Sequence, residues 1–332
     1  NDRKNGIPFY QGKKEFGFKF LNNPVIWTTS VTKASVQGDI LMSVRAPVGN
    51  VNINPFENIC IGRGLSAIRC NNEKTGYLFH YLDLISETIA GHLGATFSSI
   101  SREEITNISI PLPPLDIQQQ IVAECEKVDE EYSTAQHAIE ENKRNIEKLV
   151  SEVKGEIAQL KRIAPYTTNR IQFSAINLED YISTDNMLQN CDGICVYNGE
   201  PNIDSVIEYA KNDILVSNIR PYLKKIWFSN KKGGCSPDVL VFRPISGINA
   251  RYIYYAMKQN TFFEYIMKNV RGLKMPRGDK NHILNFSIPV PSLEEQQRIV
   301  EEIEAYEAEI VSAKLVLSAC VDKKKMILDK WL

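Results

Sequence analysis

Four features of the sequence carry residue types that catalytic sites use, but each lacks the partners that catalysis requires. Methyl transfer to adenine needs an Asn-Pro-Pro-Tyr-like loop, and the nearest string, Asn22-Asn23-Pro24-Val25, lacks the second proline and the aromatic ring. Gly12-Lys13-Lys14 is a basic turn and not a GxxxxGK[ST] phosphate loop. Pro237-Asp238 offers one acidic ligand of the kind that nucleases use, but no Asp/Glu-x-Lys follows it before residue 289. The histidines, at positions 80, 92, 137 and 282, show neither metal-ligand spacing nor a paired nucleophile.

These failures predict a chain that is not itself an enzyme and holds no metal. The elements that organise it are repeated instead. Residues 110–122 and 288–300 share an Ile-Pro-x-Pro opener that leads into a charged, Gln-Gln-containing stretch, at an offset of 178 (289 − 111). Proline excludes helix within the opener and restricts its predecessor, so helices are expected to begin around Leu115 and Leu293. Asp116 and Glu294 then fall in the first turn, where the helix dipole favours negative charge.

The regions before the openers are also duplicated. The stretch 38–44 predicts a turn and a buried strand, and its twin is 212–218, at an offset of 174 (213 − 39). A four-residue insertion (178 − 174) therefore lies in the second copy. Helices are expected over 75–90 and 250–270. Short strands with turns and a few helices make each copy an α+β domain.

After each opener, apolar residues follow a 4-3 alternation that is typical of a coiled coil; in the first stretch it runs from Ile121 and Cys125 to Ile157 and Leu160. We expect the two long helices to pair with each other, antiparallel, with the polar Asn142 and Lys324 on the seam. The predicted fold class is α+β, with two duplicated domains separated by a pair of long antiparallel coiled-coil helices. The predicted division is a first domain at 1–110, a first long helix at 111–164, a second domain at 165–288 and a second long helix at 289–332.

Composition agrees with two ordinary domains. The chain has 332 residues with 43% hydrophobic and 24% charged side chains. Net charge is −1 overall, but residues 163–288 carry 15 basic and 11 acidic side chains, while 289–332 carry 6 and 9. The domains are thus mildly basic and the helices acidic. Seven cysteines without a CxxC pair indicate a reducing compartment, which we expect to be the cytoplasm, and no apolar run predicts a membrane span.

The whole pattern resembles a known family. Ser43-Val44-Arg45-Ala46-Pro47-Val48-Gly49, Cys60-Ile61-Gly62-Arg63-Gly64-Leu65 and the two openers are similar to the DNA-specificity subunit of type I restriction–modification systems. The resemblance implies that each domain reads half of a bipartite site in double-stranded DNA. It also implies that the helices dock DNA adenine methyltransferase subunits, and with them a restriction subunit. Those partners, and not this chain, would use S-adenosylmethionine, ATP and Mg²⁺.

Sequence readout needs Arg, Lys, Asn or Gln on loops, with other basic and hydroxyl groups on phosphates. The DNA-contact candidates of the first domain are Gln11, Lys13, Lys14, Arg45, Arg63, Ser98 and Ser99. Those of the second domain are Arg220, Tyr222, Lys224, Lys225, Lys231, Lys232, Lys274 and Arg277. Any single one could instead be a solvated surface charge, and Arg45 and Arg220 could form structural ion pairs. Two clusters are favoured over single residues: Arg220 to Lys225, and Lys274 to Arg277 in a loop that contains glycine and proline.

Apolar residues off the strict seam widen the helical stripe and predict that partner helices complete a bundle there; the candidates are Val122, Val150, Val300 and Val311. Two alternatives stay open. Residues 166–174 have no counterpart before Asn1, which is expected if the chain is the specificity segment of a larger single-chain methyltransferase and endonuclease. A methyltransferase fused upstream in the same reading frame would decide for that alternative. The other is a coiled-coil scaffold that binds proteins, for which DNA affinity would be absent or insensitive to salt.

Overall fold

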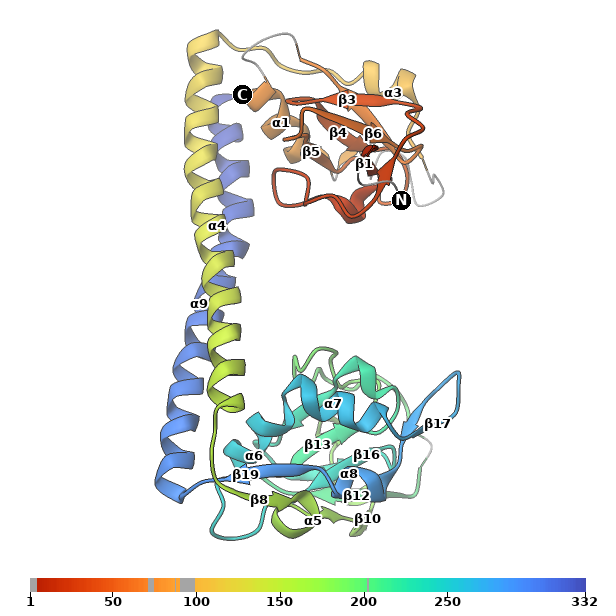
Figure 1. The fold of residues 1–332 in the computed structure, drawn as a ribbon, viewed down its shortest axis with the longest axis vertical. Coiled ribbons are helices and arrows are strands. Elements are labelled where there is room, and N and C mark those ends of the chain that lie inside the picture. The colour runs from red at the N-terminus through yellow and green to blue at the C-terminus, as the bar shows by residue number, and fades with distance from the viewer. Residues whose placement is uncertain (1–4, 71–74, 87, 90–98, 202) are drawn as a thin grey trace. The chain divides into compact units, whose positions relative to one another are not determined.

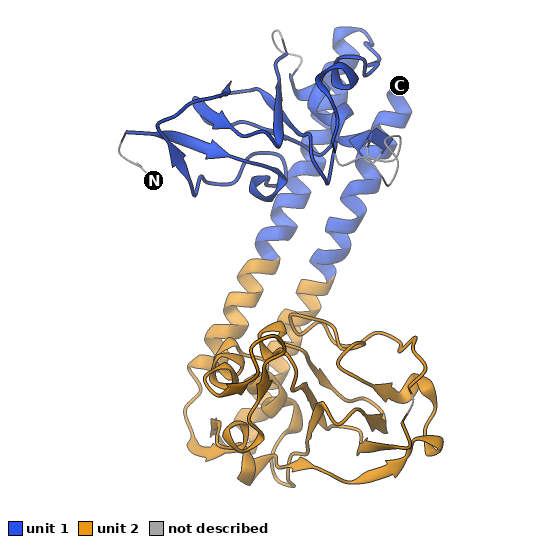
Figure 2. Cartoon of the chain, turned by 90° about the vertical axis from the view of Figure 1, so that its right-hand side faces the viewer, with its two compact units in different colours: residues 1–138, 312–332 blue, residues 139–311 orange. Residues whose placement is uncertain are grey.

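The computed structural model describes residues 5–70, 75–86, 88–89, 99–201 and 203–332. The chain divides into two compact units (Figure 2): unit 1 is Asn1–Ala138 with Ser312–Leu332, and unit 2 is Ile139–Val311. The division crosses both long helices, α4 (Leu115–Ser151) and α9 (Leu293–Trp331), so each unit contains part of each helix.

Unit 1 contains two small sheets and short helices (Figure 1). The strand order of the first sheet is β2 (Trp27–Thr28), β1 (Ile7–Tyr10), β6 (Asn58–Ile61), β3 (Ala34–Val36). The order of the second is β5 (Val51–Ile53), β4 (Ile40–Ser43), β7 (Leu65–Ile68). The helical elements before the opener are η1 (Lys13–Glu15), α1 (Thr75–Leu84) and α3 (Arg102–Thr106). Strand β4 is buried along its whole length and is the middle strand of the second sheet.

Unit 2 repeats this plan with additional strands. One sheet has the order β10 (Arg170–Gln172), β12 (Ser205–Tyr209), β15 (Gly233–Cys235), β11 (Tyr181–Ile182). The other has the order β14 (Ile226–Phe228), β13 (Ile214–Ser217), β16 (Val239–Phe242), β9 (Tyr166–Thr167). Two further strand pairs are β17 (Val270–Arg271) with β18 (Arg277–Gly278), and β8 (Glu156–Gln159) with β19 (Ser287–Val290). Its helices are α5 (Leu160–Ile163), α6 (Ala250–Met257), α7 (Asn260–Met267) and α8 (Lys280–Leu284), with short 3₁₀ turns η2 (Phe173–Ala175), η3 (Leu178–Asp180) and η4 (Pro221–Leu223).

A buried carboxylate at the start of each central strand shows how closely the copies agree. Asp39 receives two hydrogen bonds from Arg69, of 2.7 and 2.8 Å, and one from the backbone N–H of Val36. Asp213 receives the same pair from Arg243, at 2.9 and 2.7 Å, and a third from the N–H of Ala210. Bidentate Arg–carboxylate pairing fixes both distance and orientation, so it holds β7 and β16 on β4 and β13 in the same register. The predicted α+β duplication is confirmed.

The repeated opener is an interlocked junction. The side chain of Gln118 donates to the carbonyl of Pro113 at 2.7 Å, and that of Gln296 donates to Pro291 at 2.8 Å. Both glutamines are buried, so the bond satisfies an amide that would be costly to leave unpaired. The long helices begin at Leu115 and Leu293, as predicted from the prolines.

The long helices pair antiparallel within each unit. In unit 1, Lys330 lies 3.0 Å from Glu124, and Lys323 pairs with Glu131. Residue numbers therefore increase along α4 in the direction in which they decrease along α9, as in an antiparallel pair. Ile121, Cys125 and Leu328 are buried between the helices and α1. In unit 2 the predicted seam residue Asn142 donates to Glu309 at 2.8 Å. The predicted antiparallel coiled coil is confirmed.

The predicted extent of the first long helix, 111–164, is wrong at its end. Helix α4 stops at Ser151, and the chain then forms β8, α5 and β9. Gly155 is a poor helix former, and a Cβ at this position would lie 2.6 Å from the backbone nitrogen of Pro291. This close approach lets β8 pair with β19, which leaves the expected seam residue Ile157 63% exposed. The helix expected over 250–270 is likewise divided into α6 and α7.

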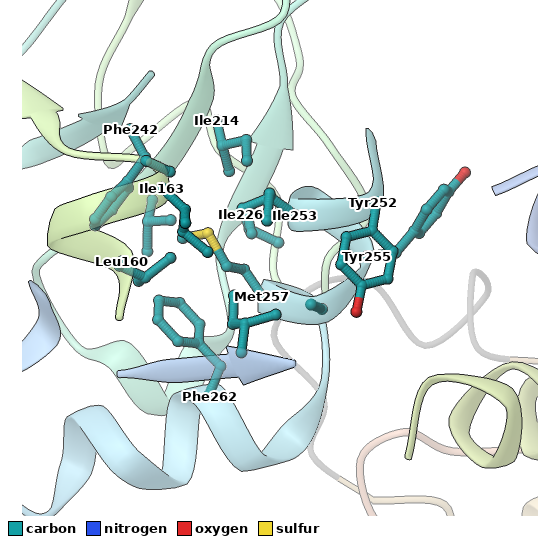
Figure 3. Close-up of a cluster of buried hydrophobic side chains, with 14 of the residues drawn as sticks. Leu160, Ile163, Ile214, Ile226, Phe242, Tyr252, Ile253, Tyr255, Met257 and Phe262 are labelled. Atoms are coloured by element: carbon teal, nitrogen blue, oxygen red, sulfur yellow. The ribbon is translucent and has the colours of Figure 1, made fainter. Parts of the chain in front are cut away.

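The segment that follows α4, made of β8, α5 and β9, packs into the core of unit 2. Figure 3 shows Leu160 and Ile163 from α5 beside Phe242 of β16, Met257 of α6 and Phe262 of α7. All five are buried. Residues 156–167, named the cover segment below, therefore form part of the core rather than part of a rod.

Candidate nucleic-acid interface

Three loops meet at one place in unit 1. The N–H of Val44, after β4, donates to the carbonyl of Gly64 at 2.9 Å. The N–H of Ile100 donates to the carbonyl of Val44 at 3.0 Å, and Arg45 forms a backbone bridge with Ser99. These bonds join the loop after β4, the loop before β7 and the segment before α3. We call this the three-loop surface.

Unit 2 builds the same surface at the offsets of the sequence repeat. The N–H of Asn218 donates to the carbonyl of Asp238 at 2.8 Å, and the N–H of Gly278 donates to that of Asn218 at 3.2 Å. A backbone bridge joins Ile219 to Arg277, as Arg45 is joined to Ser99. The loop arrangement is thus a repeated feature, whereas the side chains that it presents differ.

In unit 1 the surface presents cations and an amide. Arg45, Arg63, Lys13 and Gln11 are exposed. Gly62 donates its N–H to the carbonyl of Tyr10, and Gly64 has no room for a side chain because the carbonyl of Gln11 contacts it. Arg63 therefore lies beside the end of β1. Of the other candidates, Lys14 lies 3.6 Å from Glu15, Ser99 is exposed, and Ser98 lies outside the described residues.

In unit 2 the surface is centred on a strained arginine. Arg220 has φ +50°, which is uncommon for a residue with a side chain. Its N–H donates to the carbonyl of Pro276 at 2.8 Å, and within the described part of the chain its buried Nε has no hydrogen-bond partner. This bond brings the two predicted clusters, 220–225 and 274–277, together. Tyr222 is 49% exposed beside them.

Three predicted lysines have partners inside unit 2. Lys224 donates to Asn260 at 2.6 Å, and Lys225 donates to the carbonyl of Thr184 at 2.6 Å. Lys231 pairs with Asp180 at 2.7 Å, and its hydrogen bond lowers the pKa of that carboxyl. Lys232 and Lys274 are exposed. The structure therefore favours these two over Lys224, Lys225 and Lys231 as cations available to a ligand.

Arg271 was missed at the sequence level, although it lies only three residues before the predicted cluster 274–277. It stands opposite Arg277 across the β17–β18 hairpin. Arg277 in turn lies 3.2 Å from Asp238, the residue that suggested a nuclease ligand. Among the described residues, no group of three or more His, Cys, Asp or Glu is placed to hold a metal ion.

Of the four partner-binding candidates on the long helices, three pack against the core of their own unit and one is exposed. The expectation for Val300 is corrected: it is 3% exposed and packs in the core of unit 2, because the first turns of α9 lie against α6. Val122 and Val150 are half-buried and pack against the cores of their own units. Val311 is 58% exposed and remains a candidate. In the parts of the chain that the structure describes, no helix is long and apolar enough to cross a membrane.

Two α+β units, each with an exposed basic loop surface and each continued by a long helix, define a protein built from two copies of one domain. The family comparison makes this specific. The model of the type I restriction modification DNA specificity domain matches residues 5–144 and again 153–316, and the chain belongs to this family.

Relatives agree with this assignment. The chain is 44% identical to the putative type I restriction enzyme MjaX specificity subunit of Methanocaldococcus jannaschii over 135 residues. The aligned residues are 39% of this chain and 31% of that protein. It is similar to a solved chain of a type I R-M system (TM-score 0.58, 17% identity, 98% of this chain and 90% of that one). It is also similar to the S subunit of a type I system from M. genitalium (TM-score 0.55, 16% identity, 99% and 89%). Because the two solved structures are only 17% and 16% identical to this chain, their similarity shows the fold alone. The sequence match to the M. jannaschii protein spans less than a third of that protein's length.

Proposed function

We propose that each unit reads one half of a bipartite sequence in double-stranded DNA, and that the chain contributes recognition while partner subunits perform catalysis. The observation that carries this proposal is the three-loop surface, built by the same backbone bonds in both units with different side chains. A shared scaffold with variable side chains suits two half-sites of different sequence. The recognition domains are proposed to be residues 1–110 and 165–288, the second extended at its start by the cover segment, residues 156–167.

Roles within the surface follow from donor geometry. Arg45, Arg63 and Arg220 have planar guanidinium groups that can bond guanine O6 and N7 together in the major groove. Gln11 can bond adenine in the same way. Lys13, Lys274 and the hydroxyl of Ser99 suit phosphate oxygens, which position the protein without reading sequence. The strain at Arg220 supports a functional role, since strained residues gather at binding sites.

Selection of duplexes from a random library by the purified full chain tests the proposal. We expect a two-part motif with a fixed gap, and an affinity that falls as salt rises. Arg63→Ala should relax one base position and lose about 1–3 kcal/mol of discrimination there. Lys13→Ala should weaken all sequences alike and reduce the salt slope by about one. No enriched motif, or binding that is independent of salt, would contradict the proposal.

We further propose that the exposed side of α9 binds DNA adenine methyltransferase subunits, which would use S-adenosylmethionine, and a restriction subunit that would use ATP and Mg²⁺. Leu315 and Met326 of unit 1 are 67% and 70% exposed. They are eleven residues apart, which is about three helical turns, so they lie on one face. Exposed apolar residues on one helix face are typical of a site that packs against another helix.

Co-purification tests this surface. Leu315→Glu or Met326→Glu should abolish recovery of the methyltransferase subunit, because a charge would be buried at the contact. The matched control is Val25→Glu, which changes an exposed apolar residue (84%) of unit 1 that belongs to a loop and not to α9. Unchanged recovery with both helix variants would contradict the proposed surface.

A further inference from the structure

The β17–β18 hairpin ends in an apolar tip that the described part of the structure leaves exposed to solvent. Leu273 is 104% exposed and Met275 is 50% exposed. Gly272, with φ +86°, provides the left-handed backbone that the tip requires. Figure 1 shows the hairpin extending away from the body of unit 2.

The base of the hairpin is held firmly, in contrast to its tip. The carbonyl of Pro276 accepts the N–H of Arg220, and Gly278 donates its N–H to Asn218. A Cβ at Gly278 would lie 2.8 Å from Ile266, so only glycine fits between the hairpin and α7. The hairpin is therefore a fixed extension of the three-loop surface.

Cations surround the apolar tip. Arg271 and Arg277 stand directly opposite each other, an arrangement of like charges that by itself destabilises a strand pair. Each is partly balanced by a carboxylate: Arg271 lies 3.0 Å from Asp279, and Arg277 lies 3.2 Å from Asp238. The side chain of Arg271 is 83% exposed, and Lys274 at the tip is exposed as well. A ligand that matches this tip has anionic groups on either side of an apolar interior.

We propose that the hairpin is a wedge: Leu273 inserts between two stacked base pairs of the bound duplex, while Arg271 and Lys274 bind the phosphates on either side. This inference rests on the proposed function, since it assigns a role to a residue next to the DNA-reading surface of unit 2. Inserted apolar side chains unstack a base step and kink the duplex. Sequences whose steps deform readily are then preferred at positions that no donor contacts. Leu273 is thus a specificity-determining residue that acts through DNA deformability.

Fluorescence of 2-aminopurine, which rises when its neighbours unstack, tests the wedge. The base analogue is placed in turn at each position of a duplex selected by the full chain. Binding of the wild-type chain should raise the fluorescence several-fold at one step. Leu273→Ala should abolish that rise, whereas Leu178→Ala, which changes another exposed leucine of unit 2, should leave it unchanged.

The outcomes separate the wedge from the proposed function. Sequence-specific binding with no rise at any position, or a rise that persists in Leu273→Ala, would overturn the wedge and leave DNA recognition standing. Failure of the full chain to select any sequence would overturn both. If Leu273→Ala binds too weakly to measure, a mismatch at the identified step should restore binding, because that step is already unstacked. Failure of the mismatched duplex to restore it would also overturn the wedge.

Discussion

The two units are built alike at their centres and differently at their edges. In unit 2 the cover segment places β9 beside β16, where Val241 and Phe242 are fully buried, and β8 beside β19. Among the described residues of unit 1, no strand lies on the outer edge of β7. The matching residues Ala67 and Ile68 are only half-buried, and Leu112, the counterpart of the half-buried Val290, is 70% exposed.

This difference shows which parts of the plan depend on each other. The Asp–Arg pair, the glutamine junction and the three-loop surface are present in both units, and in unit 2 none of the bonds that form them involves the cover segment. The cover segment therefore stabilises unit 2 without shaping the surface that we propose to read DNA. Stability and recognition are separable in this fold.

The largest expected effect is on the cover segment. Leu160→Ala removes a fully buried side chain, and its cavity should lower the free energy of unfolding of unit 2 by about 2–5 kcal/mol. Hydrogen exchange should show lost protection in β13 and β16 and unchanged protection in β4. The control Ile157→Ala, on the same segment but 63% exposed, should change stability by less than about 0.5 kcal/mol. Equal loss of protection in both units would contradict the comparison.

Acid should distinguish the units through His80, whose side chain is fully buried. Burial lowers its pKa to about 3, with a further decrease from Lys324 and an opposing effect of Asp129. Asp83 on α1 and Lys19 also face this cluster. The hydroxyls of Tyr77 and Tyr252 donate to the carbonyls of the twin residues Pro111 and Pro289, so the twin of His80, three residues after Tyr77, is Tyr255, which donates to Glu307 at 2.9 Å. In the unfolded chain His80 binds a proton below about pH 6.5, whereas in the folded unit it does not do so until about pH 3. The contribution of His80 to the free energy of unfolding is therefore complete above pH 6.5 and falls as the pH is lowered from 6.5 to 3.

At pH 5 unit 1 should have lost about 2 kcal/mol relative to neutral pH, since one pKa unit corresponds to about 1.4 kcal/mol. Urea unfolding of unit 1 at several pH values measures this loss. His80→Phe should remove it and cost little at neutral pH, because in the described structure neither ring nitrogen of His80 has a hydrogen-bond partner. A pH dependence that is the same in His80→Phe would show that another group is responsible.

Removal of the Asp–Arg pair should give the smallest difference in stability loss between the two units, because the same pair is present in both. Asp39→Asn and Asp213→Asn should each cost about 1–2 kcal/mol, a value reduced by the exposure of the arginines (59% and 43%). Burial raises the pKa of Asp39, but hydrogen bonds from Arg69 and Val36 outweigh it and hold the pKa below its ordinary value. This contribution is present above pH 4 and is lost as pH falls through the lowered pKa. Thermal unfolding measures both variants, and losses that differ by more than about 1 kcal/mol would break the equivalence of the two units.

Sequence patterns predicted the features that depend on local order. The prolines located the starts of both long helices, and the 4-3 alternation located the seam residues Ile121 and Cys125. The same alternation misassigned Ile157 and Leu160, because their spacing fits a helix, while pairing of β8 with β19 depends on residues far along the chain. For the same reason the burial of Val300 was not predicted.

The candidate site was predicted less completely than the fold. Charge and residue type indicated Arg63, Arg220 and Lys274, and the structure places each on or beside a three-loop surface. They could not indicate that Lys225 donates to the carbonyl of Thr184, since that contact depends on how distant loops fold together. Nor could they indicate that the tip at Leu273 is left uncovered.

Mapping of N6-methyladenine across the genome of a host that carries the complete system tests the central claim most directly. With the intact gene we predict methylation of a two-part motif with a fixed gap. Arg63→Ala in unit 1 should alter only one half of this motif, and Tyr222→Ala in unit 2 only the other. A single continuous motif, a change in both halves from either variant, or methylation that is unaffected by deletion of the gene would contradict the account.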